Sequence, residues 1–265
     1  MAKSKKPRGA KTHYSAPALE KGFDIIELLA DSPDGLSPSE IALRLGRSLS
    51  EIFRILVVME RRDWLHKNPS TDRYSVSYRV LEYGFRATPA QALGVVAAPV
   101  MYDLATATYQ SCHMAVIAGD AIIIVQQQDS LGVSGFSVRL GRSPDIITSC
   151  SSHVLLAFSD ATVRDKLLKS ARSISPREMK NLQSRLILVK ERGYEIKPSS
   201  KHVGVNDISY PVFGFDGRIR AALTIPFLTV IDGSQHVDME EARKMLAAAA
   251  LKISQGLGWS DPNRA

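Results

Sequence analysis

The sequence of 265 residues lacks several features that define whole classes of protein. It has only two cysteines, Cys112 and Cys150, without a paired spacing, which is typical of a reducing cytosol and not of a disulfide framework. No run of about 18 apolar residues is present, and no apolar core follows the basic N-terminal residues. We therefore expect a cytoplasmic protein with neither a membrane span nor a secretory signal.

Motifs of metal and cofactor sites are also absent. The cysteines and histidines are scattered, without a chelating spacing such as C-x-x-C or H-x-x-x-H. The stretch GVSGFSVRLG lacks the strand, loop and helix context of a dinucleotide-binding motif. Cys150 and His153 suggest an alternative, an enzyme that acts on a small acyl or aromatic substrate, but no orienting acid is evident. We predict no metal, no cofactor and no catalytic activity.

The net charge of +7 is concentrated at the N-terminus. Residues 1–11 carry +5 and no acid, so the rest of the chain shares the remaining +2. A basic arm beside a folded domain suits a polyanion such as nucleic acid, although a disordered, solubilising tail has the same composition. The arm alone favours neither interpretation.

Two helices are expected near the N-terminus. Apolar positions at helical spacing begin at Ala18, and the turn residues DSPDG end them. A short helix follows over residues 38–45. Ser37 and Glu40 form a capping box at its start, and Gly46 suits its left-handed end.

A third helix begins after Ser48 and carries an apolar stripe. The stripe is spaced i, i+3, i+4 and i+7, and it consists of Ile52, Ile55, Leu56 and Met59. Strands over 65–67 and 73–76 flank the turn NPSTD and form a hairpin. Two helices joined by a tight turn and followed by a hairpin predict a winged helix-turn-helix, which lays its last helix in the major groove.

The second half of the chain mixes helices and strands without a βαβ repeat. A long helical segment over 91–109 contains Pro99, which we expect to kink or break it. Further helices are expected over 152–158, 161–169, 176–192 and 238–257. Strands are expected on both sides of the turn AGDA and over 135–141, 203–213 and 218–226. The predicted fold class is α+β.

Several segments together resemble the IclR family of bacterial transcription regulators. They are ALEKGFDIIELLADSPDGLSPSEIALRLGRSLSEIFRILVVMERRDWL, the wing RYSV and, in the second half, GDAIIIVQQ, SSHVLLAF, KERGYE, DGRIRAALTI and ISQGLG. The resemblance covers nearly the whole chain from Ser15 and rests on the order and spacing of these segments. It implies a basic disordered arm over 1–14, a winged helix-turn-helix over 15–77 and a linker helix over 78–90. Residues 91–260 would form an α/β effector-binding domain with a central antiparallel sheet.

The resemblance also implies a function. Such regulators bind operator DNA as dimers or tetramers, and a small metabolite, often an organic or aromatic acid, alters that binding. We therefore predict a homodimeric or homotetrameric regulator that binds a double-stranded DNA operator and a small organic acid effector. A winged-helix module that binds protein instead of DNA is the second alternative.

The candidate DNA contacts lie on the third helix, in the turn before it, on the supporting helix and on the wing: Ser39, Arg47, Ser48, Ser50, Phe53, Arg54, Lys67 and Arg73. Arg54 can read guanine or contact phosphate, and Phe53 can touch a thymine methyl. The cations outside this helix suit phosphate contacts, which position the protein without specifying sequence. For Glu51 we favour closure of a capping box with Ser48 over contact with a cytosine amino group.

The resemblance carries the family's ligand contacts to six positions in the second half: Cys150, Ser151, Lys197, Asp207, Thr224 and Pro226. The first two lie just before the helix that is expected from Ser152. Backbone N–H groups at the start of a helix favour a carboxylate. We therefore expect the organic acid to bind between the sheet and the loops that precede this helix.

Overall fold

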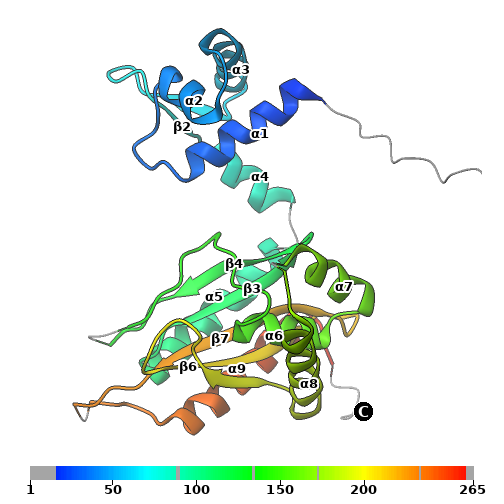
Figure 1. The fold of residues 1–265 in the computed structure, drawn as a ribbon. Helices are drawn as coiled ribbons and strands as arrows, with labels where there is room; N and C mark the ends of the chain where they lie inside the picture. The colour runs from blue at the N-terminus through cyan, green and yellow to red at the C-terminus, as the bar shows by residue number, and fades with distance from the viewer. Residues whose placement is uncertain (1–15, 88–89, 133–134, 172, 233, 261–265) are drawn as a thin grey trace, which may run out of the picture. The chain divides into compact units, whose positions relative to one another are not determined.

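A computed structural model of the protein describes residues 16–87, 90–132, 135–171, 173–232 and 234–260 (Figure 1). The chain divides into two compact units, residues 1–88 and 89–265. The basic arm expected over residues 1–14 lies outside the described residues. None of the described helices combines the length and the apolar composition that crossing a bilayer requires.

The N-terminal unit is a winged helix-turn-helix, as the sequence predicts. Its elements are α1 (Pro17–Ala30), α2 (Pro38–Leu45), α3 (Leu49–Arg61), β1 (Leu65–Lys67), β2 (Tyr74–Val76) and α4 (Arg79–Ala87). One apolar core joins α1, α2, α3 and the two strands, and in it Ile25, Ile52 and Tyr74 are almost completely buried. The antiparallel hairpin of β1 and β2 forms the wing.

Serine caps set the starts of α2 and α3. Ser37 accepts from the Glu40 N–H, and the Glu40 carboxylate accepts from the Ser37 N–H at 2.8 Å, so this capping box is complete. Ser48 likewise accepts from the Glu51 N–H. The carboxylate of Glu51 pairs with Lys21 of α1, and a hydrogen bond with the Ser48 backbone also contributes to the lowering of its pKa. Glu51 therefore lies at the start of α3, as a cap requires, and in addition joins α3 to α1 through a tertiary ion pair.

The wing is tied to the connection between α1 and α2. Leu36 and Tyr74 exchange backbone hydrogen bonds of 3.0 and 2.8 Å across an isolated bridge. Gly35 precedes this bridge with a φ of +65°, and a Cβ atom there would lie 2.6 Å from the Tyr74 carbonyl oxygen. Glycine is therefore required at this position if the wing is to approach so closely.

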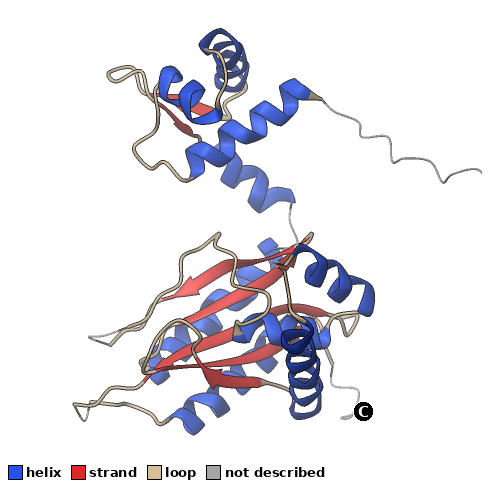
Figure 2. Cartoon of the chain, viewed as in Figure 1, coloured by secondary structure: helices blue, strands red, loops and turns tan. Residues whose placement is uncertain are grey.

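The C-terminal unit is a five-stranded sheet with helices on both faces (Figure 2). Its elements are α5 (Ala90–Thr108), β3 (Cys112–Ala118), β4 (Ala121–Gln128), α6 (Cys150–Phe158), α7 (Ala161–Ser170), α8 (Pro176–Arg192), β5 (Glu195–Pro198), β6 (Val205–Phe213), β7 (Ile219–Leu228) and α9 (Met239–Gly256). The strand order is β4-β3-β7-β6-β5, and every pairing is antiparallel. The predicted fold class is therefore confirmed.

The two faces of the sheet pack against different helices. One apolar core lies between the sheet and α5 with α9, and a second lies between the sheet and α6 with α8. On β7, Leu223 and Ile225 belong to the first core, whereas Ala222 belongs to the second. Because side chains alternate along a strand, Thr224 shares the face of Ala222. We call this side the α6 face of the sheet.

Three local features differ from the expectations. Residues 135–141 form no regular strand, and only the end of this segment exchanges backbone bonds with Ile124, because a turn follows at once. Helix α5 continues through Pro99 without a break. Strand β5 was not expected, since it is only four residues long and follows the helix-ending Gly193.

We expect Gly35→Ala to destabilise the N-terminal unit by about 3 kcal/mol, since the new Cβ adds a clash to the strain of a positive φ. Gly46→Ala is the matched control, because Gly46 has a φ of +61° but no atom within 4 Å of its Cβ position. There we expect a cost of about 1 kcal/mol. Urea unfolding of the full chain measures both losses. Equal losses would contradict the close approach of the wing at Gly35.

Candidate nucleic-acid interface and effector site

The exposed side of α3 is the candidate DNA-reading surface. The apolar stripe of this helix packs into the core of the unit, as its spacing predicts. Ser50, Phe53 and Arg54 are exposed, and Phe53 retains 50% of its accessible surface. A hydroxyl, a phenyl ring and a guanidinium on one helix supply hydrogen-bonding, apolar and charged groups, which are the three kinds of contact that base edges accept.

The turn and α2 place three further candidates. Arg47 lies exposed in the turn between α2 and α3, and Ser39 lies exposed in the first turn of α2. Ser48 caps α3, and its hydroxyl oxygen lies 3.4 Å from that of Ser50. Six of the eight candidate DNA contacts therefore lie on the helix-turn-helix itself, and the other two lie on or beside the strands of the wing.

The two wing candidates are engaged within the unit. Lys67 Nζ lies 2.8 Å from Asp72 Oδ1, and this contact raises the pKa of the lysine. The Arg73 guanidinium donates to Glu40 Oε1 at 2.9 Å and to the Gly35 carbonyl oxygen at 3.1 Å. Arg73 therefore holds the wing against α2 in this structure. Its phosphate contact stays a prediction, and it requires that the guanidinium share or leave these partners.

A basic hollow that was not predicted from the sequence lies at the end of α3. This hollow has a volume of about 420 Å³ and is lined by Arg61, Arg62, Asp63, Trp64, Arg79 and Tyr83. The rings of Trp64 and Tyr83 stack with 5.4 Å between their centroids, and Arg79 pairs with Asp63. In the sequence, only the pair of arginines at the end of the helix could have indicated this hollow. Arginines are also common there because they interact favourably with the helix dipole.

A row of polar side chains crosses the α6 face of the C-terminal sheet. From one edge of the sheet to the other, strand register aligns Gln127, His113, Thr224, Ser209 and Glu195. Residues that lie directly opposite one another share a face, so the whole row faces the side of α6. The hydroxyl oxygens of Ser209 and Thr224 lie 2.8 Å apart. We call this set the polar row. Only Thr224 was a sequence candidate, because the row depends on pairing between distant strands.

The start of α6 lies over β5 and β6. Cys150 Sγ lies 3.6 Å from the Glu195 carbonyl oxygen and 3.3 Å from the Asp207 carbonyl oxygen. Cys150 and Ser151, both expected just before this helix, are buried in its first turn. Among the described residues, the Ser149 side chain makes no capping bond to the first turn. The helix therefore has an uncapped N-terminus, which attracts anions.

The remaining candidates lie on the α6 face, beside the polar row. Lys197, Asp207 and Pro226 are register partners on β5, β6 and β7. Lys197 Nζ donates to the Thr148 carbonyl oxygen at 2.6 Å, so the ammonium lies beside the loop that leads into α6. Burial raises the pKa of Asp207, although Lys197 and His202 oppose the rise. All six candidate effector positions therefore come together at the start of α6 and on the adjoining strands.

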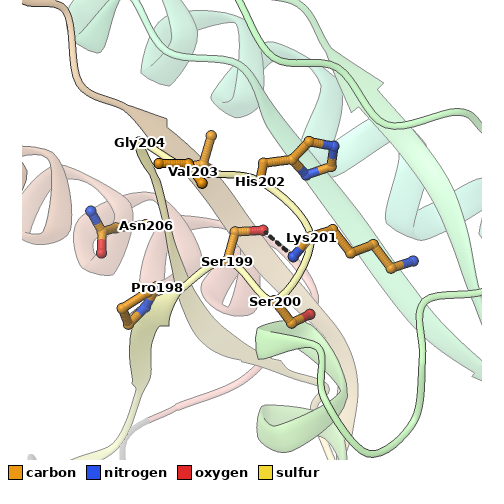
Figure 3. Close-up of a pocket in the computed structure, with 9 residues that line it drawn as sticks. Pro198, Ser199, Ser200, Lys201, His202, Val203, Gly204 and Asn206 are labelled. Carbon is orange, nitrogen blue, oxygen red and sulfur yellow. Dashed lines mark hydrogen bonds between the residues drawn. The ribbon is translucent and has the colours of Figure 1, made fainter.

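The connection between β5 and β6 forms an open hollow (Figure 3). Residues 198–206 line this hollow, which has a volume of about 450 Å³. His202 packs edge-on against Phe136, with 4.5 Å between the ring centroids. The connection therefore contacts the segment between β4 and α6.

Glu195 ends the polar row as a buried carboxylate with several donors. Arg185 donates to its two oxygens at 2.7 and 2.8 Å, Arg192 donates to Oε1, and His153 Nδ1 lies 2.9 Å from Oε2. Burial raises the pKa of this carboxyl, but the bonds from His153 and Arg185 outweigh that effect and lower the pKa to about 2. This cluster joins α6, α8 and β5.

Cys150 and His153 are not arranged as a nucleophile and its base. Burial raises the pKa of the Cys150 thiol well above its ordinary value, so the thiol stays protonated. The two ring nitrogens of His153 face Glu195 and, at 2.8 Å, the Ile147 carbonyl oxygen. Both residues therefore serve packing and hydrogen bonding. Within the described ranges, no group of three or more His, Cys, Asp or Glu residues could hold a metal ion.

We expect Glu195→Gln to lower the free energy of unfolding of the C-terminal unit by about 3 kcal/mol, because two partly buried arginines lose their carboxylate. Urea unfolding of the full chain at pH 7 measures the loss. Glu191→Gln removes an exposed carboxylate from α8 and serves as the control, with an expected change below about 0.5 kcal/mol.

The stability that Glu195 contributes depends on pH. Its folded-state pKa of about 2 lies below the ordinary value of 4.5, so this stability is complete above pH 4.5 and is lost as the pH falls toward 2. The difference between the wild type and Glu195→Gln should therefore shrink between pH 5 and pH 3. A constant difference over this range would show that the carboxylate charge contributes nothing.

Two family models match the chain. The IclR helix-turn-helix domain matches residues 18–69, and the bacterial transcriptional regulator IclR C-terminal domain matches residues 86–255. The transcriptional regulator KdgR of Escherichia coli strain K12 is 25% identical over 252 residues, which cover 93% of this chain and 95% of KdgR.

Solved structures share the fold. HmgR of Pseudomonas aeruginosa aligns with a TM-score of 0.74 at 23% identity, over 92% of this chain and 100% of HmgR. An IclR homologue from Microbacterium hydrocarbonoxydans, solved with 4-hydroxybenzoate, aligns with a TM-score of 0.77 at 20% identity, over 91% of this chain and 98% of that one. With both domain models matched in order, the chain belongs to the IclR family of transcriptional regulators, which bind DNA through a helix-turn-helix and are not enzymes.

Proposed function

We propose that this regulator reads operator DNA with α3 and that a small organic acid, bound at the start of α6, changes its affinity for the operator. The observation that carries the first half is the exposed side of α3. In the major groove, Ser50, Phe53 and Arg54 reach base edges there. Contacts to the phosphates come from Ser39, Arg47, Ser48, Lys67 and Arg73, which fix the register of the protein on the duplex.

The uncapped start of α6 carries the second half of the proposal. A carboxylate bound there accepts from the free N–H groups of the first turn, near Cys150 and Ser151. The Lys197 ammonium, held beside the same loop, neutralises its charge. Asp207, Thr224 and Pro226 line the sheet below. The 4-hydroxybenzoate in the homologue from Microbacterium hydrocarbonoxydans supports a carboxylic acid as the class of ligand.

The regulator acts as a homodimer or homotetramer in this proposal. A single helix contacts too few base pairs to select one site in a genome, whereas a two-fold dimer reads two half-sites about 34 Å apart or a multiple of that distance. The acid changes operator affinity only if it binds one state of this oligomer better than the other.

Arg54→Ala should weaken binding to the operator about tenfold or more, because one guanidinium contact to base or phosphate is lost. The operator is first selected from random duplexes with the wild type, and fluorescence anisotropy then gives the affinities at several salt concentrations. Arg177→Ala, an exposed arginine on α8, is the control and should leave the affinity unchanged. Unaltered binding by Arg54→Ala, or no salt-dependent duplex binding at all, contradicts the proposed interface.

A carboxylate probe should bind the full-length protein better than its uncharged amide. We expect 4-hydroxybenzoate, but not 4-hydroxybenzamide, to raise the melting temperature, since ligand at 100 times its dissociation constant adds about 2.7 kcal/mol. Lys197→Gln should weaken the acid about tenfold, because an ammonium near the carboxylate is removed. Lys166→Gln on α7, also exposed, is the control. Equal shifts with acid and amide contradict a carboxylate site.

A further inference from the structure

Two polar atoms of the polar row are buried without a partner. Among the described residues, His113 Nδ1 and Gln127 Oε1 have no hydrogen-bond partner, and His113 is only 6% exposed. A buried polar atom that makes no hydrogen bond costs about 1–3 kcal/mol, and native proteins contain few of them. Two such atoms on facing residues therefore indicate a place where something else completes the hydrogen bonds.

The two residues adjoin the proposed effector site. His113 and Gln127 lie opposite one another on β3 and β4, and His113 lies opposite Thr224 on β7. Thr224 is a candidate effector contact, and neighbouring strands are about 4.8 Å apart. A ligand that extends from Thr224 across β3 is therefore within reach of both unpartnered atoms, because β4 lies two strand spacings, about 10 Å, from β7.

The chemistry of the two atoms selects the kind of group they can bind. The Gln127 amide nitrogen donates to the Gln128 carbonyl oxygen and to Asp129 Oδ1, each at 3.3 Å, which leaves Oε1 as an acceptor. Burial lowers the pKa of His113 to about 4, so its ring is neutral at pH 7. A neutral imidazole nitrogen either donates or accepts, according to the tautomer.

A hydroxyl group matches this pair. Its hydrogen can be donated to Gln127 Oε1 while its oxygen accepts from the His113 Nδ1–H. A carboxylate has only acceptor oxygens and is repelled by Gln127 Oε1. We propose that His113 and Gln127 bind a hydroxyl of the effector, so that the ligand is a hydroxylated carboxylic acid with its carboxylate toward α6 and its hydroxyl toward β3 and β4. This inference rests on the proposed acid site.

Paired probes that differ only in the hydroxyl test this assignment. Isothermal titration calorimetry of the full-length protein compares 4-hydroxybenzoate with benzoate, and 6-hydroxyhexanoate with hexanoate. We expect the wild type to bind the hydroxylated member of at least one pair about tenfold tighter, the effect of a single buried hydrogen bond. Gln127→Leu and His113→Phe should each reduce that preference below about twofold.

The neighbouring glutamine offers a matched control. Gln126 faces α5, since its Oε1 lies 4.0 Å from the Cβ position of Gly94 on that helix. Gln126→Leu should therefore keep the preference. A preference that Gln126→Leu and Gln127→Leu reduce equally overturns the assignment. Equal affinities within both pairs also overturn it but leave the acid effector standing, whereas no binding by any of the four carboxylates overturns both proposals.

Discussion

The buried carboxylate of Glu195 fixes the geometry on which the C-terminal unit depends. It accepts hydrogen bonds from Arg185 and Arg192 of α8 and from His153 of α6, while its own strand forms an edge of the sheet. Removing the Glu195 carboxylate leaves two partly buried arginines without it, and removing one of its donors leaves a fully buried charge with fewer hydrogen bonds, which is costly for a buried ion. Together with the contacts of Cys150 to two strand carbonyls, the cluster sets where α6 begins over β5 and β6. The uncapped end of the helix therefore faces the candidate effector residues.

Local signals predicted most of the fold. Ser37 with Glu40 and the apolar stripe of α3 act within a few residues, so the sequence reveals the elements they form. Long-range partners were not predictable in this way. Lys21 lies thirty positions before Glu51, and no local pattern indicates that the two side chains form an ion pair. Strand β5 is stabilised by its antiparallel neighbour β6 and by the ions around Glu195, and four residues carry no periodicity that could reveal it.

The two candidate sites differ in how far the sequence could predict them. The DNA-reading side of α3 follows from helical spacing alone, because the residues that are not buried must face outward. The effector positions came only from the family resemblance, and the structure adds the register that brings them together. The polar row could not be predicted from the sequence, because its five members lie on five different strands. Arg73 is a case in which the sequence was incomplete. Its charge in the sequence predicted a contact with a DNA phosphate, but in the structure its guanidinium donates to Glu40.

One irregularity in β4 decides which of three consecutive glutamines lies opposite His113 on the α6 face of the sheet. Met114 pairs with Gln126 but Ala115 pairs with Ile124, so Val125 is an extra residue without a counterpart on β3. Beyond this bulge the alternation of the strand is reversed, and Gln127 occupies the α6 face in place of Gln126. Deletion of Val125 would remove the bulge and keep Gln127 opposite His113, whereas pairing Val125 in a regular ladder would bring Gln126 to the α6 face instead. The position of the bulge, and not the type of residue alone, therefore determines which glutamine side chain points to the α6 face.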